Sequence, residues 1–210
     1  DPASALDMYN VAIGYNAGYA VTTGINNTLI GSLAGDALTT GSGSVALGYN
    51  ALGSTTTAIE NVAIGINALV ANVDGAKNVA VGSYALTALD PASATDMYNV
   101  AVGHQAGTAI TTGTTTTLLG GFAGTALTTA TENTALGYSA LGAATTSARN
   151  VAVGTLALGS GVMNTGTNTY NVAVGFYAGK AITTGVQNTI IGGLAGDALT
   201  EGGENTIIGY

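Results

Sequence analysis

The chain of 210 residues has no cysteine and no tryptophan, one histidine, and only three basic residues. Without cysteine there is no disulfide framework, and the redox compartment cannot be inferred. The basic residues Lys77, Arg149 and Lys180 are too scattered to replace phosphate counterions, which excludes nucleic acid as a partner class. No apolar run reaches the roughly 18 residues of a membrane span without Gly, Thr or Asn interrupting it. Charged residues make up 7% of the chain, against about 25% in typical soluble domains, which is unlike an ordinary globular enzyme.

The chain instead repeats one short motif, of which "NVAIG" at residues 10–14 is the first copy. Successive copies start 17 residues apart, except for two intervals of 21 that hold four-residue insertions near 90–98 and 162–170. Residues 1–210 therefore form a single array, and because it ends within a motif copy we expect it to be part of a longer chain. The copies start at Asn10, Asn27, Ser44, Asn61, Asn78, Asn99, Thr116, Asn133, Asn150, Asn171, Asn188 and Asn205.

The composition of each motif position predicts its structure. The second position is Val or Thr, the fourth is Ile, Val or Leu, and the fifth is Gly in every copy. Residues with high β propensity at alternate positions indicate a strand, and the Gly indicates a tight bend after it. A further turn is indicated by "TTG" at 22–24, 111–113 and 183–185. We expect one repeat to form one coil with two short strands and two bends.

Short repeats rich in glycine and β-branched residues are typical of β-solenoids, whereas helical repeats are longer. The sequence thus predicts an all-β parallel β-solenoid of about twelve 17-residue coils. In such a fold identical residues stack about 4.8 Å apart along the axis. The first motif position is Asn in ten of twelve copies. We expect these Asn side chains to hydrogen-bond along the column and to turn backbone, rather than to line a binding stripe.

The two faces of the predicted strand are both apolar. The residues that flank the centre of the motif strand point to one face, and the central residue, Ala or a bulky aliphatic, points to the other. Two apolar faces indicate that both are buried. We expect one face to fill the coil and the other, formed by the central Ala and Leu residues, to meet neighbouring copies of the chain. Three copies around an axis is the simplest arrangement for so thin a roll.

The phrases "NVAIG", "NTLIG" and "NTALGYSALG" resemble the head repeats of trimeric autotransporter adhesins and, more closely, the repeat shafts of phage tail fibres. The resemblance covers nearly the whole chain. It implies a left-handed parallel β-roll, a homotrimer, and an extracellular, cell-surface or virion location. It also implies the role of a stalk or an adhesive surface.

Five residues are candidates for surface contact, all in the variable position directly after the motif Gly: Tyr15, Tyr49, His104, Tyr138 and Phe176. Loops on rigid scaffolds often carry recognition, so these corners and the insertions are the expected contact points. A catalytic role for His104 is not favoured, because no Ser/His/Asp arrangement accompanies the single histidine. We expect no enzymatic activity and no cofactor.

Three alternatives stay open. Asp90 and Asp96 of one insertion, with Asp1 and Asp7 of its N-terminal copy, are candidate calcium ligands, although the "GGxGxD" phrase of calcium-binding rolls is absent. The recurring Thr residues suggest an ice-binding or glycan-binding solenoid as an alternative function. Against ice binding, the two side chains of an adjacent "TT" pair would point to opposite faces of a strand. The sequon at Asn26 falls inside the repeat column and is poor evidence of glycosylation. The leading expectation is a structural or adhesive fibre segment whose receptor is a host-surface glycan or protein.

Overall fold

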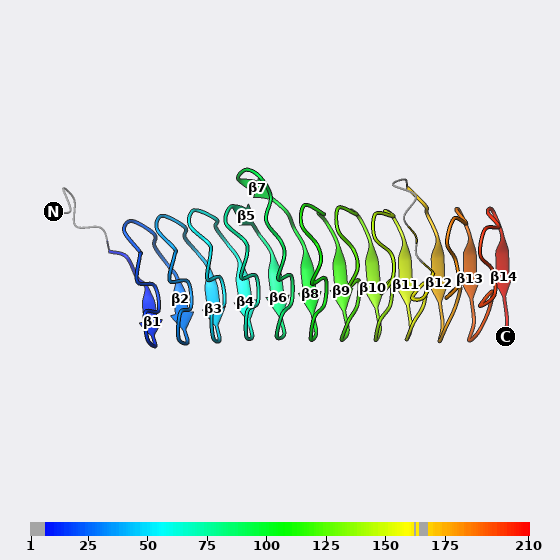
Figure 1. The fold of residues 1–210 in the computed structure, drawn as a ribbon, viewed down its shortest axis with the longest axis horizontal. Coiled ribbons are helices and arrows are strands. Elements are labelled where there is room, and N and C mark those ends of the chain that lie inside the picture. The colour runs from blue at the N-terminus through cyan, green and yellow to red at the C-terminus, as the bar shows by residue number, and fades with distance from the viewer. Residues whose placement is uncertain (1–6, 162, 164–167) are drawn as a thin grey trace.

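The computed structural model describes residues 7–161, 163 and 168–210, which wind into a parallel β-solenoid of about 11 turns. Twelve three-residue strands, one for each motif copy, form a single parallel sheet along the whole rod (Figure 1). A second sheet pairs β5 (Gly75–Ala76) with β7 (Thr95–Asp96). The twelve strands are β1 (Val11–Ile13), β2 (Thr28–Ile30), β3 (Val45–Leu47), β4 (Val62–Ile64), β6 (Val79–Val81), β8 (Val100–Val102), β9 (Thr117–Leu119), β10 (Thr134–Leu136), β11 (Val151–Val153), β12 (Val172–Val174), β13 (Thr189–Ile191) and β14 (Thr206–Ile208). Over the described ranges no helix is present that is long and apolar enough to cross a membrane.

The register of the sheet follows the repeat. Val11 pairs with Thr28, 17 residues later, and the same offset continues along the sheet wherever the motif spacing is 17. At the first insertion Val79 pairs with Val100, so the four additional residues leave the register unchanged. The insertion loops out of the rod, carrying β7 with it (Figure 1). The predicted all-β parallel solenoid with a 17-residue coil is confirmed.

The prediction of two strands per coil is wrong for most of the rod. Outside β5, β7 and one isolated parallel bridge between Ala148 and Asn168, the described residues after the motif Gly form turns, bends and irregular chain. The reason is that positions seven and nine of each coil have positive φ, as in Asn16 (53°) and Gly18 (62°), which interrupts an extended chain. The turns still join neighbouring coils through the backbone. The Gly18 N–H donates to the Ala34 carbonyl at 2.9 Å, and the Leu33 N–H donates to the Tyr15 carbonyl at 2.8 Å.

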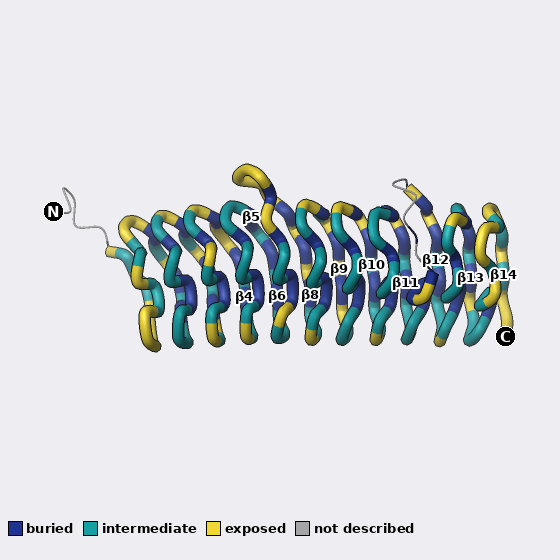
Figure 2. The backbone as a smooth tube through the Cα atoms, in the orientation of Figure 1, coloured by how far each residue is buried: buried dark blue, intermediate teal, exposed yellow. Residues whose placement is uncertain are grey.

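The expectation that the central strand residues face other chains is also wrong. Leu29 and Ala46 are 0% exposed and lie inside the coil, whereas the flanking Ile13 and Leu119 are 59% and 49% exposed. The central residue, which is Ala in eight strands and Leu or Ile in four, points into the coil, and the Val, Ile, Leu and Thr side chains of the strand ends point outward. Figure 2 shows buried segments along the turns in the middle of the rod, and exposed segments at the corners and at the first and last strands.

The interior is filled by matching large residues against glycines. In β2 the central residue is Leu29, and a Cβ on either Gly18 or Gly35 would come within 2.9 Å of its side chain. Both glycines occupy position nine of their coils. Coils in which position nine is leucine instead carry alanine at the strand centre, as Leu52 and Ala46 do. A third combination, Ala at the centre and Gly at position nine, occurs in the coils that directly precede a Leu- or Ile-centred strand, as in Ala12 and Gly18.

The first motif position forms the predicted Asn ladder. In Asn61 the amide Nδ2 donates to the Gly75 carbonyl at 2.8 Å, and Oδ1 accepts the Asn78 backbone N–H at 2.9 Å. One side chain thus closes the turn of its own coil and joins the next coil. Where the column holds Ser44, its hydroxyl oxygen accepts the Asn61 N–H at 3.3 Å. In the described part of the chain no buried side-chain nitrogen or oxygen lacks a partner.

The motif Gly is required by both its conformation and its surroundings. Gly48 has a φ of 136°, in the region that favours glycine. A Cβ at this position would lie 2.7 Å from the carbonyl oxygen of Gly65, the equivalent glycine of the next coil. Backbone therefore stacks on backbone at this corner, and the following residue is turned outward.

Candidate functional site

The corner after the motif Gly places all five candidate contact residues at the surface. Tyr15, Tyr49, Tyr138 and Phe176 are exposed, and so is His104. This exposure was predictable from the sequence, because a position that varies between coils directly after a sharp bend is expected to face solvent. Which of these side chains meet was not predictable in this way.

His104 and Tyr138 are brought together by a residue that sequence analysis missed. Phe122 lies between them, with ring centroids 5.4 Å from His104 and 5.6 Å from Tyr138. On its other side His104 contacts the ring of Tyr84 at 6.2 Å. Tyr84 and Phe122 occupy the next position along the coil, and the presence of aromatic residues in that column is the signal that was available. Tyr15 and Tyr49 have no ring neighbour among the described residues.

Phe176 belongs to a separate cluster near the C-terminal end. Its ring stacks on Tyr177 with centroids 4.0 Å apart and an interplanar angle of 14°. The ammonium of Lys180 lies 4.6 Å from the centroid of Tyr177 and 3.7 Å from a carboxylate oxygen of Asp197. This corner is therefore charged, unlike the one around His104.

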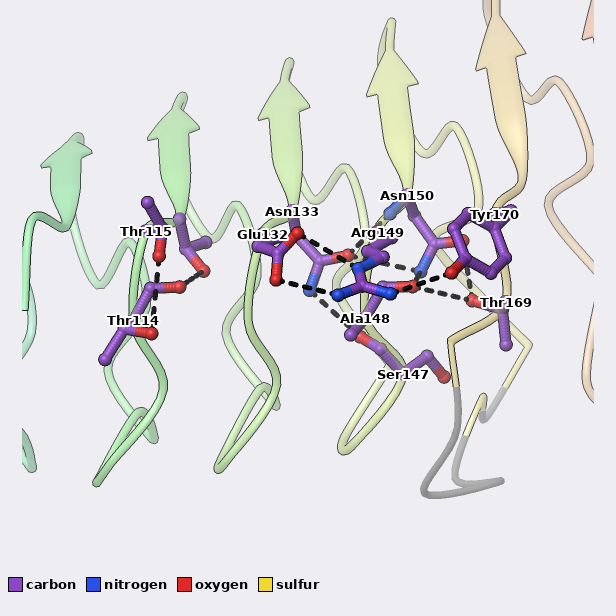
Figure 3. A network of polar contacts seen from close by, with 11 residues as sticks. Thr114, Thr115, Glu132, Asn133, Ser147, Ala148, Arg149, Asn150, Thr169 and Tyr170 are labelled. Atoms are coloured by element: carbon purple, nitrogen blue, oxygen red, sulfur yellow. Dashed lines mark hydrogen bonds and ion pairs between the residues drawn. The ribbon is translucent and has the colours of Figure 1, made fainter.

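A third group of exposed tyrosines stands directly before the Asn column, next to the insertions. The Arg149 guanidinium donates to both carboxylate oxygens of Glu132, at 3.0 and 3.2 Å, and to the Tyr170 hydroxyl at 2.7 Å (Figure 3). Hydrogen bonding to Arg149 lowers the pKa of Glu132, and that to Glu132, with a smaller contribution from Tyr170, raises the pKa of Arg149. These side chains are exposed, so each pair contributes little to stability.

The first insertion repeats this arrangement with Lys77 as the cation. Its ammonium donates to Asp96 at 2.7 Å and lies 5.4 Å from the ring centroid of Tyr98. The hydrogen bond from Lys77 lowers the pKa of Asp96, and the same bond, with a smaller contribution from Tyr98, raises the pKa of Lys77. Both insertions are thus followed by a tyrosine that a cation from the preceding coil holds in place.

A hollow lies beside the first insertion. Its volume is about 660 Å³, and its lining residues come from two successive turns and the inserted loop. They are Thr57, Ala58, Ile59, Asp74, Ala76, Ala94, Thr95 and Asp96. Thr57 donates to Asp74 at 2.6 Å, so one of the two carboxylates is bound to a hydroxyl and the other to Lys77.

The three candidate calcium ligands that the structure describes do not gather at one place. Asp96 is paired with Lys77, whereas Asp90 accepts the Val73 N–H at 3.3 Å. Asp7 accepts the hydroxyl of Tyr9 at 3.0 Å, and Asp1 lies outside the described residues. Within the part of the chain that the structure describes, no group of three or more His, Asp or Glu side chains is placed to hold a metal ion.

The Thr ranks use their hydroxyl groups within the rod. The Thr22 hydroxyl donates to the Thr39 carbonyl at 3.1 Å, and the Thr39 hydroxyl donates to the Thr56 carbonyl at 3.0 Å. The same bond recurs between Thr183 and Thr200 at 3.2 Å. These hydroxyl groups donate their protons to the next coil, and therefore do not offer them to an ice lattice outside the rod. The sequon residue Asn26 is exposed at the corner before the ladder.

The outer face of the long sheet is a continuous aliphatic stripe. Its column of third strand residues is Ile, Val or Leu in all twelve strands, and its column of first strand residues is Val in seven and Thr in five. None of these residues is charged. They are half-buried or exposed in the single chain, and Leu47 and Ile191 are 43% and 40% exposed. An apolar surface this long and regular indicates an interaction site.

Comparison of the chain with protein-family models, curated proteins and solved structures gave no match. Its function is therefore inferred from these surfaces.

Proposed function

We propose that this chain is a rigid, non-enzymatic segment of an extracellular, cell-surface or virion fibre, in which three copies pack through the outer strand face. The observation that carries the proposal is the aliphatic stripe on that face, which contains no charged residue from β1 to β14. A stripe of Val, Ile and Leu left in water along a whole rod would favour aggregation, so it requires a cover.

Further copies of the same chain are the cover that fits best. The side chains of the stripe recur at the spacing of parallel strands, about 4.8 Å. An identical rod laid alongside in the same direction presents the same spacing, so contacts made at one coil recur at every other coil. A partner without this repeat would match the stripe only locally. Three copies around an axis parallel to the rods would cover the stripe of each chain with its two neighbours.

The hydrogen bonding of the coils suits a mechanical role. Neighbouring coils are joined at the sheet, at the Asn ladder and at the turns, as in the bonds from Val62 to Asn78 and from Leu69 to Ala85. An extended structure bonded on all sides resists bending and local opening, and its corners are held at fixed spacing. The exposed rings and the inserted loop at these corners are then available for attachment to a host-surface receptor.

The mass of the purified chain in solution tests the proposal. We expect light scattering after size-exclusion chromatography to give three times the chain mass of 20.3 kDa. Val81→Lys and Val153→Lys place a charge in the middle of the stripe, and each should reduce the mass to that of one chain while the β-rich circular dichroism spectrum persists. Thr129→Lys, at an exposed corner away from the stripe, is the matched control and should leave the mass unchanged.

A wild-type mass of 20.3 kDa would overturn the assembly. A threefold mass that survives both stripe substitutions would show that the chains pack through a different face.

A further inference from the structure

Four rings from four consecutive coils form one contiguous row at the corner after the motif Gly, which we call the aromatic ladder: Tyr84, His104, Phe122 and Tyr138. Successive centroids are 6.2, 5.4 and 5.6 Å apart, and the interplanar angles of 88°, 82° and 71° make each contact edge-to-face. Edge-to-face contacts are favourable, so the rings stabilise one another without being covered. Tyr84 and Tyr138 remain 39% and 55% exposed.

The row is continuous because its members alternate between two neighbouring columns. His104 and Tyr138 directly follow the motif Gly, whereas Tyr84 and Phe122 occupy the next position, where φ is 62° and 59°. This alternation offsets successive rings across the corner, so that each ring meets the edge or face of the next. The ladder consequently runs parallel to the rod axis, with one ring for each coil.

The coil segments that carry the ladder, residues 83–88, 104–109, 121–126 and 138–143, contain no acidic side chain, no lysine and no arginine. A shallow hollow of about 330 Å³ adjoins its C-terminal end and is lined by Phe122, Tyr138, Ser139 and Thr125 among others. The Thr125 hydroxyl donates to the Phe122 carbonyl, which leaves the lone pairs of its oxygen to accept hydrogen bonds.

We propose that the aromatic ladder binds a neutral, linear oligosaccharide that lies along the rod. Pyranose rings have apolar faces, which pack on aromatic side chains, and hydroxyl groups, which bond to neighbouring Thr and Ser. A shallow row of rings that are one coil apart suits an extended chain of sugar units better than an enclosed small molecule. The lack of an Arg or Lys disfavours sulfated or carboxylated sugars, because nothing at the corner would pair with the anion. This inference specifies the attachment that the proposed fibre function assumes.

Binding is tested by isothermal titration of the assembled wild-type chain with cellohexaose, N-acetylated chitohexaose, laminarihexaose and maltohexaose, each neutral, and with hexagalacturonate, which is anionic. We expect saturable binding of at least one neutral hexasaccharide and none of hexagalacturonate. Phe122→Ala and Tyr138→Ala should each weaken that binding by about tenfold. The matched control is Tyr49→Ala, in the same column as Tyr138 and equally exposed at 52%, but outside the ladder. It should bind as the wild type does.

The solution mass of every variant is measured alongside, which separates this inference from the proposed assembly. The inference is overturned if no neutral hexasaccharide binds, if hexagalacturonate binds more tightly, or if Tyr49→Ala weakens binding as much as Tyr138→Ala does. It is also overturned if the ladder variants dissociate the assembly, because the rings would then belong to the interface between chains. None of the first three results bears on whether the chain is trimeric.

Discussion

Replacing Asn133 with alanine removes one rung of the Asn ladder, and the cost can be worked out from its bonds. Nδ2 donates to the Ser147 carbonyl at 2.9 Å, and Oδ1 accepts the backbone N–H of Asn150 at 2.9 Å (Figure 3). Alanine leaves both backbone groups buried without a partner, because Ser147 and Asn150 are fully buried. At about 1–3 kcal/mol for each orphaned group, unfolding should be easier by about 2–6 kcal/mol.

Urea unfolding at a fixed chain concentration measures this loss, and hydrogen exchange of the Asn150 amide locates it. Asn133→Ser is the matched control, because Ser44 already shows that a hydroxyl at this position accepts the N–H of the next coil. It should cost about half as much, since only the carbonyl of Ser147 is then unpaired. A loss below about 1 kcal/mol for alanine, with unchanged exchange at Asn150, would refute the idea that the ladder side chains stabilise the coils.

Three further predictions concern the bend, the interior and the surface. Gly48→Ala should destabilise the chain by at least about 2 kcal/mol in urea, because alanine is strained at a φ of 136°, whereas Gly193→Ala, with no atom within 4 Å of the new Cβ, should be tolerated. Equal effects of the two would contradict the backbone stacking. Leu118→Ala should lower the free energy of unfolding by about 2–5 kcal/mol in the same assay, because it empties the centre of a fully packed coil, and a neutral result would contradict that packing. In a carboxyl NMR titration Glu132 should have a pKa below its ordinary 4.5, and Arg149→Gln should restore the ordinary value. The small stabilisation from this pair is present above pH 4.5 and is lost as the pH falls through the lowered pKa, so an unaltered Glu132 titration in the variant would contradict the pairing.

The period, the register and the Asn ladder were predictable because each repeats in every coil. A column that is Asn in ten of twelve copies has one consistent explanation in a stacked fold, and the structure gives its hydrogen bonds as expected. The unchanged register at the insertions was likewise implied by the motif itself, which resumes intact at Asn99 and Asn171.

The orientation of the strand faces was not predictable by the same means. Alternation assigns Ala12 and Ile13 to opposite faces but does not say which face is inside. Bulk usually indicates the interior, but here it does not decide, because Leu29 and Leu118 lie inside the coil whereas the equally bulky Leu119 points outward. The sequence indicates the inner face only through the co-occurrence of Leu29 with Gly18 and Gly35, which make room for its side chain. This signal links two motif positions and is not visible in either position alone.

The turns after the strand were predicted wrongly because the residue types there do not indicate the backbone conformation. Position nine has positive φ whether it holds glycine, as in Gly107, or leucine, as in Leu86 with a φ of 49°. Leucine gives no local signal for that region of φ and ψ, which it adopts because neighbouring coils impose it. For the same reason the place of Phe122 in the row of rings could not be predicted, because its φ of 59° is not indicated by its residue type.

The fit between Leu118 and its glycines restricts how such a rod can change its length. Gly107 stands between Leu86 and Leu118, and a Cβ there would come within 3 Å of both side chains. If residues 99–115 alone were deleted, the leucine of an earlier turn would occupy that place and collide with Leu118. Deleting 99–132 removes the bulky centre together with both of its glycines and rejoins compatible surfaces. Recombination can therefore shorten or lengthen the rod here only by sets of turns that keep each bulky centre together with its two glycines. The length of such a rod changes in steps of whole sets.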